Sequence, residues 1–291
     1  MNRHALLFTL AVVATTPAAE AADIGSKLAP LRMSTEDLRG SSILAANNQV
    51  TASFVETSTF YMERSAAGVR YDSERGWLPG LAISASVMEN WGVDDLYLFG
   101  QFKWVNATTT YTGAYIGGTY GDLVQKSGAS TVNVDFRVGK GFAIFDGTML
   151  TPYAGLGWRN WTRTLTGAGG YREDYRHGYF GAGAMVQYAP VEHWVIGLSG
   201  LVGRTFSAEM ATTPTPGGAA VPADKFRLGA STLFMAGASV DYAMTSHAHV
   251  GAGVDYVGHR YGASAANIYG MYEPDSRTDE VTMKVGLGYS F

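Results

Sequence analysis

The last twelve residues of the chain constrain its fold more than any other segment. From Glu280 to Phe291 the sequence reads EVTMKVGLGYSF, in which apolar residues alternate with polar or very small ones. Successive side chains of a β-strand point to opposite faces, so this strand would have one wholly apolar face. The other face contains Gly286 and Gly288, which suit a crowded interior better than a solvated surface. We therefore expect the apolar face to point outward.

The same period-two pattern recurs nine times upstream. We expect ten strands, lying within residues 50–63, 81–87, 96–104, 132–138, 150–158, 180–188, 194–202, 230–242, 248–260 and 280–291. The first strand is untidy because Glu56 falls on its apolar face, which a bulge or a shifted start would explain. Alternation with the apolar face outward predicts an all-β, transmembrane antiparallel up-and-down β-barrel of ten strands, with eight or twelve as alternatives.

The composition excludes several other classes of protein. The chain of 291 residues is 46% hydrophobic and 16% charged, which argues against disorder. It has no Cys for a disulfide framework, and no run of about 18 or more apolar residues that would form a membrane helix. A net charge of −4 provides no basic surface for nucleic acid, which we do not expect as a partner.

The connections between the expected strands alternate in length. Short ones lie at 90–95, 145–148, 189–193 and 243–247, and long ones at 64–80, 107–130, 165–178, 207–227 and 262–279. Short periplasmic turns and longer outer loops are typical of transmembrane barrels. This predicts five long extracellular loops, with both chain ends in the periplasm. Within them, Met210–Lys225 has three Pro and few bulky residues, so we expect it to be exposed.

The first residues predict export from the cytoplasm. Arg3 precedes the apolar run Ala5–Ala14, and Ala19-Glu20-Ala21 follows as a small-x-small site, so residues 1–21 are expected to be a cleaved signal peptide. Residues 22–49 have no clear strand pattern. We expect them to form a periplasmic segment of short helix or coil, with a plug of the barrel lumen as an alternative. Residues 50–291 then form the barrel domain.

The end of the chain also carries a resemblance to a known group. Leu287, Tyr289 and Phe291 lie on one face of the segment VGLGYSF, which resembles the terminal signature of bacterial outer-membrane β-barrel proteins. The resemblance implies that the barrel assembly machinery reads this segment. It also implies a place in the bacterial outer membrane, in contact with outer-membrane lipid and lipopolysaccharide. Any extracellular ligand stays unidentified.

Some ten-stranded barrels are enzymes, but the sequence lacks their motifs. The omptin proteases use an acidic pair spaced by one residue and an Asp-x-His dyad, and this sequence has no Asp-x-Asp or Asp-x-His. No His is followed two residues later by Ser, as in the lipid A deacylases. We therefore expect a non-enzymatic protein, structural or surface-interacting through its loops, without cofactor or metal. The alternatives are a small porin-like channel and a hydrolase of lipid or peptide split across the loops, drawing on His177, His259, Glu173, Asp174 and Ser264.

Six charged residues fall on inward faces of the expected strands, and they have both signs. They are Lys103, Asp135, Arg137, Arg159, Asp255 and Lys284. Unpaired charge is costly in a narrow interior, so we expect these side chains to pair across the lumen. A ten-stranded barrel is closer in size to side-chain-filled barrels than to open porins. We therefore interpret the six as an internal polar network rather than an ion pathway.

Overall fold

The computed structural model describes residues 35–291, except residues 116, 167–169 and 216–221. The expected signal peptide (1–21) and residues 22–34 of the expected periplasmic segment lie outside the described residues. Both remain predictions.

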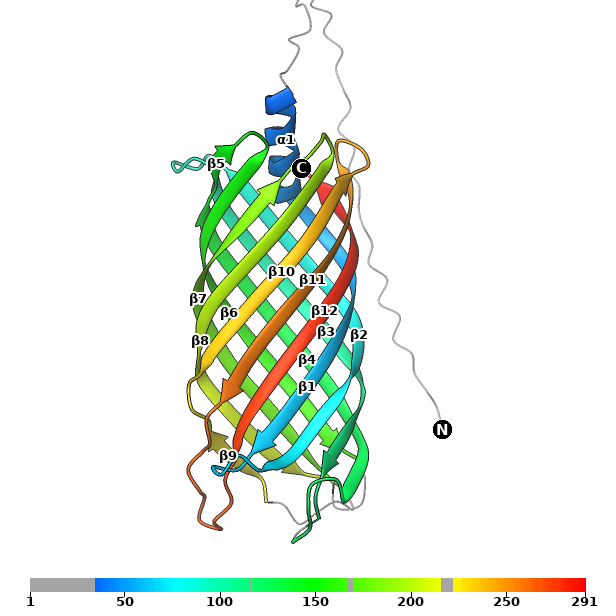
Figure 1. Cartoon of the computed structure of the whole chain (residues 1–291), viewed down its shortest axis with the longest axis vertical. Helices are drawn as coiled ribbons and strands as arrows, with labels where there is room; N and C mark the ends of the chain where they lie inside the picture. Colours follow the sequence, from blue (N-terminus) through cyan, green and yellow to red (C-terminus); the bar gives the residue numbers. More distant parts are fainter. Residues whose placement is uncertain (1–34, 116, 167–169, 216–221) are drawn as a thin grey trace, which may run out of the picture. The chain divides into compact units, whose positions relative to one another are not determined.

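Ten antiparallel strands form a closed barrel (Figure 1). They are β1 (Gln49–Arg64), β2 (Arg70–Glu89), β3 (Leu96–Gly113), β4 (Leu123–Lys140), β6 (Thr148–Leu165), β7 (Tyr171–Tyr188), β8 (Trp194–Pro214), β10 (Thr232–Ala243), β11 (Ala248–Tyr261) and β12 (Asp275–Ser290). Each pairs with its neighbour in the chain, and β1 pairs with β12 to close the ring. Two short strands, β5 (Phe142–Phe145) and β9 (Asp224–Arg227), pair with β6 and β8. The prediction of a ten-stranded barrel is confirmed.

The apolar faces point outward, as the alternation predicts. Phe54 and Leu287 are 71% and 64% exposed, whereas their inward neighbours Val55 and Gly286 are buried. Because β1 pairs with β12, neither strand leaves an edge of unpaired backbone N–H and C=O groups. Such groups would be costly in lipid, where no water can hydrogen-bond to them. The expected irregularity at Glu56 is wrong, because the β1 register runs without a shift from Gln49 to Glu63. Glu56 simply occupies an outward position.

The strands are longer than expected, and the five loops are shorter. The loops run over 65–69, 114–122, 166–170, 215–223 and 262–274, so much of each expected long loop is strand. The expected exposure of Met210–Lys225 is wrong at its start, because Met210 is buried in β8. Lys225 is exposed but lies in β9, which pairs back onto β8, and residues 216–221 lie outside the described residues. Beyond the apolar band the outward residues become Thr, Ser and Arg. Hydropathy alternation therefore ends there, although the hydrogen-bonded ladder continues.

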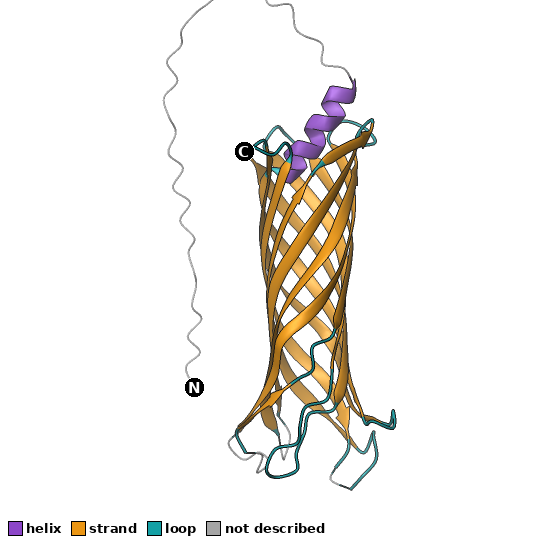
Figure 2. Cartoon of the chain, turned by 90° about the vertical axis from the view of Figure 1, so that its left-hand side faces the viewer, coloured by secondary structure: helices purple, strands orange, loops and turns teal. Residues whose placement is uncertain are grey.

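Within the described residues one helix, α1 (Thr35–Asn47), immediately precedes β1 and lies at the end of the barrel where the chain terminates (Figure 2). We call this end the terminal end and the opposite one the loop end. Ile43 of α1 is 1% exposed and packs in a cluster with Met88, Tyr97 and Val195 of the barrel. In the part of the chain that the structure describes, no helix has the length and apolarity to cross a membrane.

Candidate functional site

The barrel lumen contains three layers of side chains and, toward α1, a cavity of about 180 Å³ lined by Asn47, Gln101 and Lys284 among others. The middle layer contains all six residues predicted from the sequence. Two of them reach across the lumen. Arg159 of β6 donates to both carboxylate oxygens of Glu280 on β12, at 2.8 and 2.7 Å. Lys103 of β3 donates to the hydroxyl of Thr282, also on β12, at 3.0 Å. These contacts connect opposite walls of the barrel.

The other four charged residues pair locally rather than across the lumen. Asp135 and Arg137 lie two residues apart on β4, with 3.2 Å between their charged atoms. The Arg137 guanidinium also lies over the rings of Phe99 and Tyr153, about 5 Å from each centroid. Lys284 of β12 donates to Asp255 of the adjacent β11 at 2.7 Å. The expected cross-lumen pairing is therefore wrong for these four, because a partner of opposite charge lies closer along or beside the strand.

Two buried histidines border a small cavity in this middle layer. His177 and His259 have ring centroids 4.8 Å apart, and His177 hydrogen-bonds the hydroxyl of Tyr261 through Nδ1. Neither ring nitrogen of His259 has a partner among the described residues. The cavity, of about 70 Å³, is also lined by Arg159 and Glu280. It has room for a few water molecules, which would satisfy His259.

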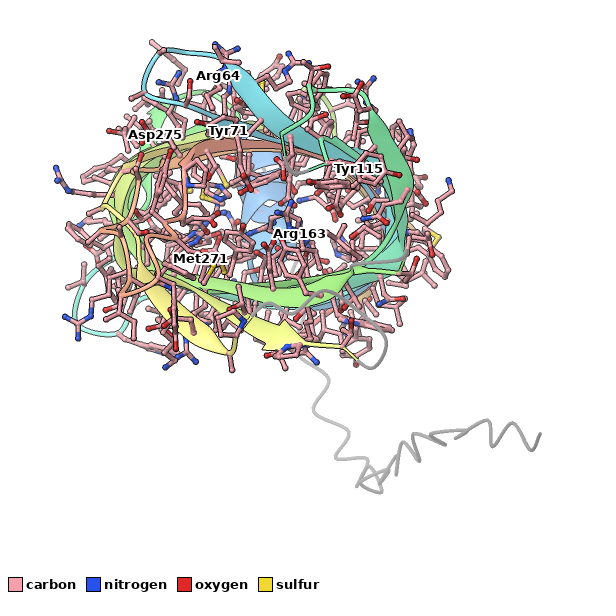
Figure 3. All side chains as sticks on the ribbon, turned by 90° about the horizontal axis from the view of Figure 1, so that it is seen from below. Arg64, Tyr71, Tyr115, Arg163, Met271 and Asp275 are labelled. Carbon is pink, nitrogen blue, oxygen red and sulfur yellow. The ribbon has the colours of Figure 1, made fainter. Side chains whose placement is uncertain are left out.

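The second layer lies at the loop end and is organised around Arg163 of β6. Its guanidinium is 1% exposed and forms ion pairs with four carboxylates: Glu63 at 3.1 Å, Asp72 at 3.3 Å, Glu74 at 3.7 Å, and Glu173. The four acids come from β1, β2 and β7. Arg163 lies five residues beyond the outward-facing Trp158 along β6, so the layer sits on the loop side of the apolar band. Figure 3 shows Arg163 inside the ring of strands, and Arg64 and Asp275 near its rim.

Aromatic rings and a fifth acid complete this layer. The Arg163 guanidinium lies 4.9 Å from the ring centroid of Tyr61 and 5.7 Å from that of Tyr175, which favours a desolvated cation. Glu273, from the loop 262–274, accepts from the Tyr175 hydroxyl at 2.6 Å and lies 3.2 Å from that of Tyr61. Burial, together with the nearby Glu63 and Glu173, raises the pKa of Glu273 well above its usual range. A protonated Glu273 reduces the excess of negative charge in the layer.

The third layer closes the terminal end beneath α1. Asn47 and Gln187 exchange two amide hydrogen bonds, at 2.7 and 3.1 Å. His249 lies between Asp241, 2.6 Å from Nδ1, and the hydroxyl of Ser290, 2.7 Å from Nε2.

The order Ser290–His249–Asp241 is that of a hydrolase triad. However, the Ser290 hydroxyl is also 2.9 Å from the backbone carbonyl of Ala45 in α1, and the residue is only 4% exposed. A nucleophile must reach its substrate, whereas this serine is covered by the helix. The hydrogen-bonded chain of Asp241, His249 and Ser290 therefore ends on a carbonyl of α1 and holds the helix against the barrel wall.

The residues of the split-hydrolase alternative are not brought together as a nucleophile and base. Ser264 accepts from the backbone amide of Glu273 at 2.9 Å, and Asp174 pairs with Arg172 on the outer face. His177 and His259 face the internal cavity. Among the described residues no group of three or more His, Asp or Glu side chains is arranged to hold a metal ion.

Sequence reasoning missed two parts of this site. Glu280 stood on the polar face of the last strand, beside Thr282 and Lys284, and that position was the available signal for a lumen acid. The Arg163 layer was missed because its residues fall in or beside segments expected to be loops. The spacing of Asp72 and Glu74, and of Glu173 and Tyr175, by one residue was the signal that these segments continue as strands with one inward face.

Comparison with known proteins identifies the fold. No family model matches the sequence, and no curated protein matches it significantly. Among solved structures, the outer membrane protease OmpT from Escherichia coli matches with a TM-score of 0.53 and 10% identity, covering 84% of this chain and 97% of that one. The toluene transporter TodX of P. putida (TM-score 0.34, 11% identity, 88% and 92% covered) and Ail of Yersinia pestis (TM-score 0.32, 11% identity, 84% and 99% covered) match less closely. Identity this low shows the fold alone, which is that of bacterial outer-membrane β-barrels.

Proposed function

We propose that this bacterial outer-membrane β-barrel is a closed, non-conducting protein of the outer membrane that acts at its loop end, as a rigid surface for interaction with a partner outside the cell. The observation that carries the proposal is the Arg163 layer. One guanidinium, four carboxylates in contact with it and a set of aromatic rings fill the lumen beyond the apolar band. This filling leaves the loop end as a solid platform rather than the mouth of a pore.

The other layers support the same proposal. The Arg159–Glu280 pair spans the middle of the lumen, and α1 covers part of the terminal end through the packing of Ile43. Opening a path for ions would require separating a buried, bidentate ion pair, and buried pairs broken on one side cost about 3–5 kcal/mol. Such contacts are typical of a fixed interior rather than of side chains that move apart to let ions through.

The proposed orientation places the loop end outside the cell. Of the four connections at the terminal end, three are short turns and the fourth contains the β5 hairpin. The longest connection, the 13 residues 262–274, lies at the loop end. Longer connections face outward in transmembrane barrels of this type. The expected periplasmic segment would then include α1.

A conductance measurement tests the closed lumen. The full-length protein, refolded and inserted into a planar lipid bilayer, should give no current steps above those of a protein-free bilayer. An open porin inserted under the same conditions is the positive control, and a gel-shift assay confirms that the sample is folded. Reproducible unit steps from the folded protein would instead establish the small channel, for which the polar cavity beside His259 is the structural support.

A further inference from the structure

Three arginines project from the outer surface of the barrel at the loop end. Arg64, Arg260 and Arg277 alternate with the buried, inward-facing Glu63, His259 and Ser276 on β1, β11 and β12, which are adjacent strands. All three are exposed. They lie on the outside of the wall, whereas the Arg163 layer lies inside it.

The three arginines line a pair of hollows in the outer wall. One, of about 250 Å³, is bordered by Arg64, Arg260 and Arg277, and its lining also includes Met62, Asp275 and Ser276. The other, of about 500 Å³, shares Arg260 and Arg277 and continues to Phe234 and Tyr256. Gly258, on the outward face of β11, contributes no side chain, and the phenol ring of Tyr256 lies over it. The two hollows share Arg260 and Arg277, and we call them together the arginine groove, which spans β10, β11, β12 and β1.

The charges of this groove are incompletely balanced. Arg277 pairs with Asp279 at 2.7 Å, and Asp275 lies opposite Arg64 in the register of β1 and β12. Three arginines therefore face two carboxylates, and neither Arg64 nor Arg260 forms an ion pair among the described residues. Arg260 and Arg277 are also directly opposed in the register of β11 and β12. Like charges directly opposite each other on neighbouring strands are destabilising, and a bound anion would relieve the repulsion.

The surface next to the groove is apolar. Phe234, Val254, Val281 and Met283 project from the same strands toward the terminal end and are 39–52% exposed. An occupant that matches both parts must have a negatively charged head and hydrocarbon chains. Arginine is suited to phosphate because its planar fork of donors fits two phosphate oxygens.

We propose that this groove binds the phosphate of a phosphorylated, acylated glycolipid of the outer leaflet, such as the lipid A part of lipopolysaccharide, with its acyl chains against the apolar wall. The assignment rests on the proposed orientation, since such lipids occupy the outer leaflet. It adds a specific lipid site on the side of the barrel, separate from the partner surface at the loop end.

Binding of lipid A in detergent micelles, counted by native mass spectrometry, tests the proposal. The full-length protein is compared with the triple variant Arg64→Gln, Arg260→Gln, Arg277→Gln. The matched control, Arg75→Gln, Arg172→Gln, Arg227→Gln, removes the same charge from exposed arginines outside the groove. The single change Arg260→Glu serves as a second groove variant, and a gel shift confirms that each variant is folded. The probes are lipid A, lipid A freed of phosphate, and sodium phosphate.

The groove variants should bind lipid A at least about tenfold more weakly than the wild type, whereas the control should stay within about twofold. Wild-type binding should fall on removal of the phosphates and with rising salt. Equal binding by the groove and control variants, or equal binding of dephosphorylated lipid, would overturn the proposal. Tight binding of free phosphate that lipid A does not displace would also overturn it. The measurement is made in micelles, so its outcome is independent of conductance and of orientation in the cell.

Discussion

At the scale of single residues, Arg163 is the cation on which the loop-end layer depends. Four carboxylates contact its guanidinium, and Glu273 is held nearby by two tyrosine hydroxyls. Without the arginine, these acids would repel one another in a site that water reaches poorly. The residue therefore stabilises the layer chiefly by preventing that repulsion.

The change Arg163→Met tests this dependence. Removing one partner of a buried ion pair costs about 3–5 kcal/mol, so we expect the free energy of unfolding to fall by that amount at neutral pH. The loss should be smaller in acid, where the carboxyl groups can take up protons. Denaturant titration of the refolded barrel measures both effects. Arg172→Met, which removes an exposed pair with Asp174, is the control and should cost about 0–1 kcal/mol. Similar losses for both variants would contradict the assigned role of Arg163.

Glu273 makes the docking of the loop 262–274 depend on pH. Its pKa is raised in the folded protein by burial and by Glu63 and Glu173, so the folded state holds a proton that the unfolded loop would release. The contribution of Glu273 to docking is therefore fully present below the ordinary pKa of glutamate and is lost as pH rises through the raised value.

Hydrogen exchange of the loop 262–274, corrected for the intrinsic effect of pH, measures this prediction. Protection should be greater at pH 5 than at pH 8, values chosen to lie above the ordinary pKa of Glu, about 4.3. Glu273→Gln should remove most of the difference, because its amide stays uncharged and can still hydrogen-bond the tyrosine hydroxyls. Wild-type protection that is unchanged or increases with pH would show that the carboxyl is ionised when docked.

At the scale of elements, the sequence predicts the part of each strand that touches the apolar band and little beyond it. The pattern from Val281 to Phe291 was sufficient because the two sides of that strand meet lipid and lumen. In β7, by contrast, Glu173 and Tyr175 face inward while Asp174 and Arg176 face outward into water. A strand with polar side chains on both faces shows no alternation of hydropathy, so its sequence pattern does not predict it.

The candidate site divides in the same way. The six inward charges could be predicted because they interrupt apolar strands, but their partners depend on the barrel's register and width. Arg159 reaches Glu280 because β6 lies opposite β12 across a narrow ring, and Lys103 reaches Thr282 from β3, three strands from β12 around the same ring. The position of α1 depends on Ile43 finding an apolar pocket made by four separate strands, which no local pattern reveals.

At the scale of the whole molecule, the closed wall and the packed side chains of the loop end support the proposed platform rather than a channel. The same architecture gives the molecule two chemically different ends: a terminal end with a helix and short turns, and a loop end where the strands extend past the lipid. Which end faces the outside decides whether the loop surface can meet an external partner. It also decides whether the arginine groove lies in the leaflet that contains lipopolysaccharide.

Site-directed labelling in cells determines the orientation, and the absence of native Cys gives a clean background. Ile268→Cys places a thiol in the loop 262–274, where the native side chain is 91% exposed, and Met244→Cys places one in the turn at the terminal end, where it is 49% exposed. A membrane-impermeant maleimide should label Ile268→Cys in intact cells. It should label Met244→Cys only after the outer membrane is permeabilised, because the reagent must otherwise cross the lipid. Neither substitution removes a buried contact, so both proteins should fold as the wild type does. The reverse pattern would invert the topology and leave the loop end facing the periplasm, where it could contact no partner outside the cell.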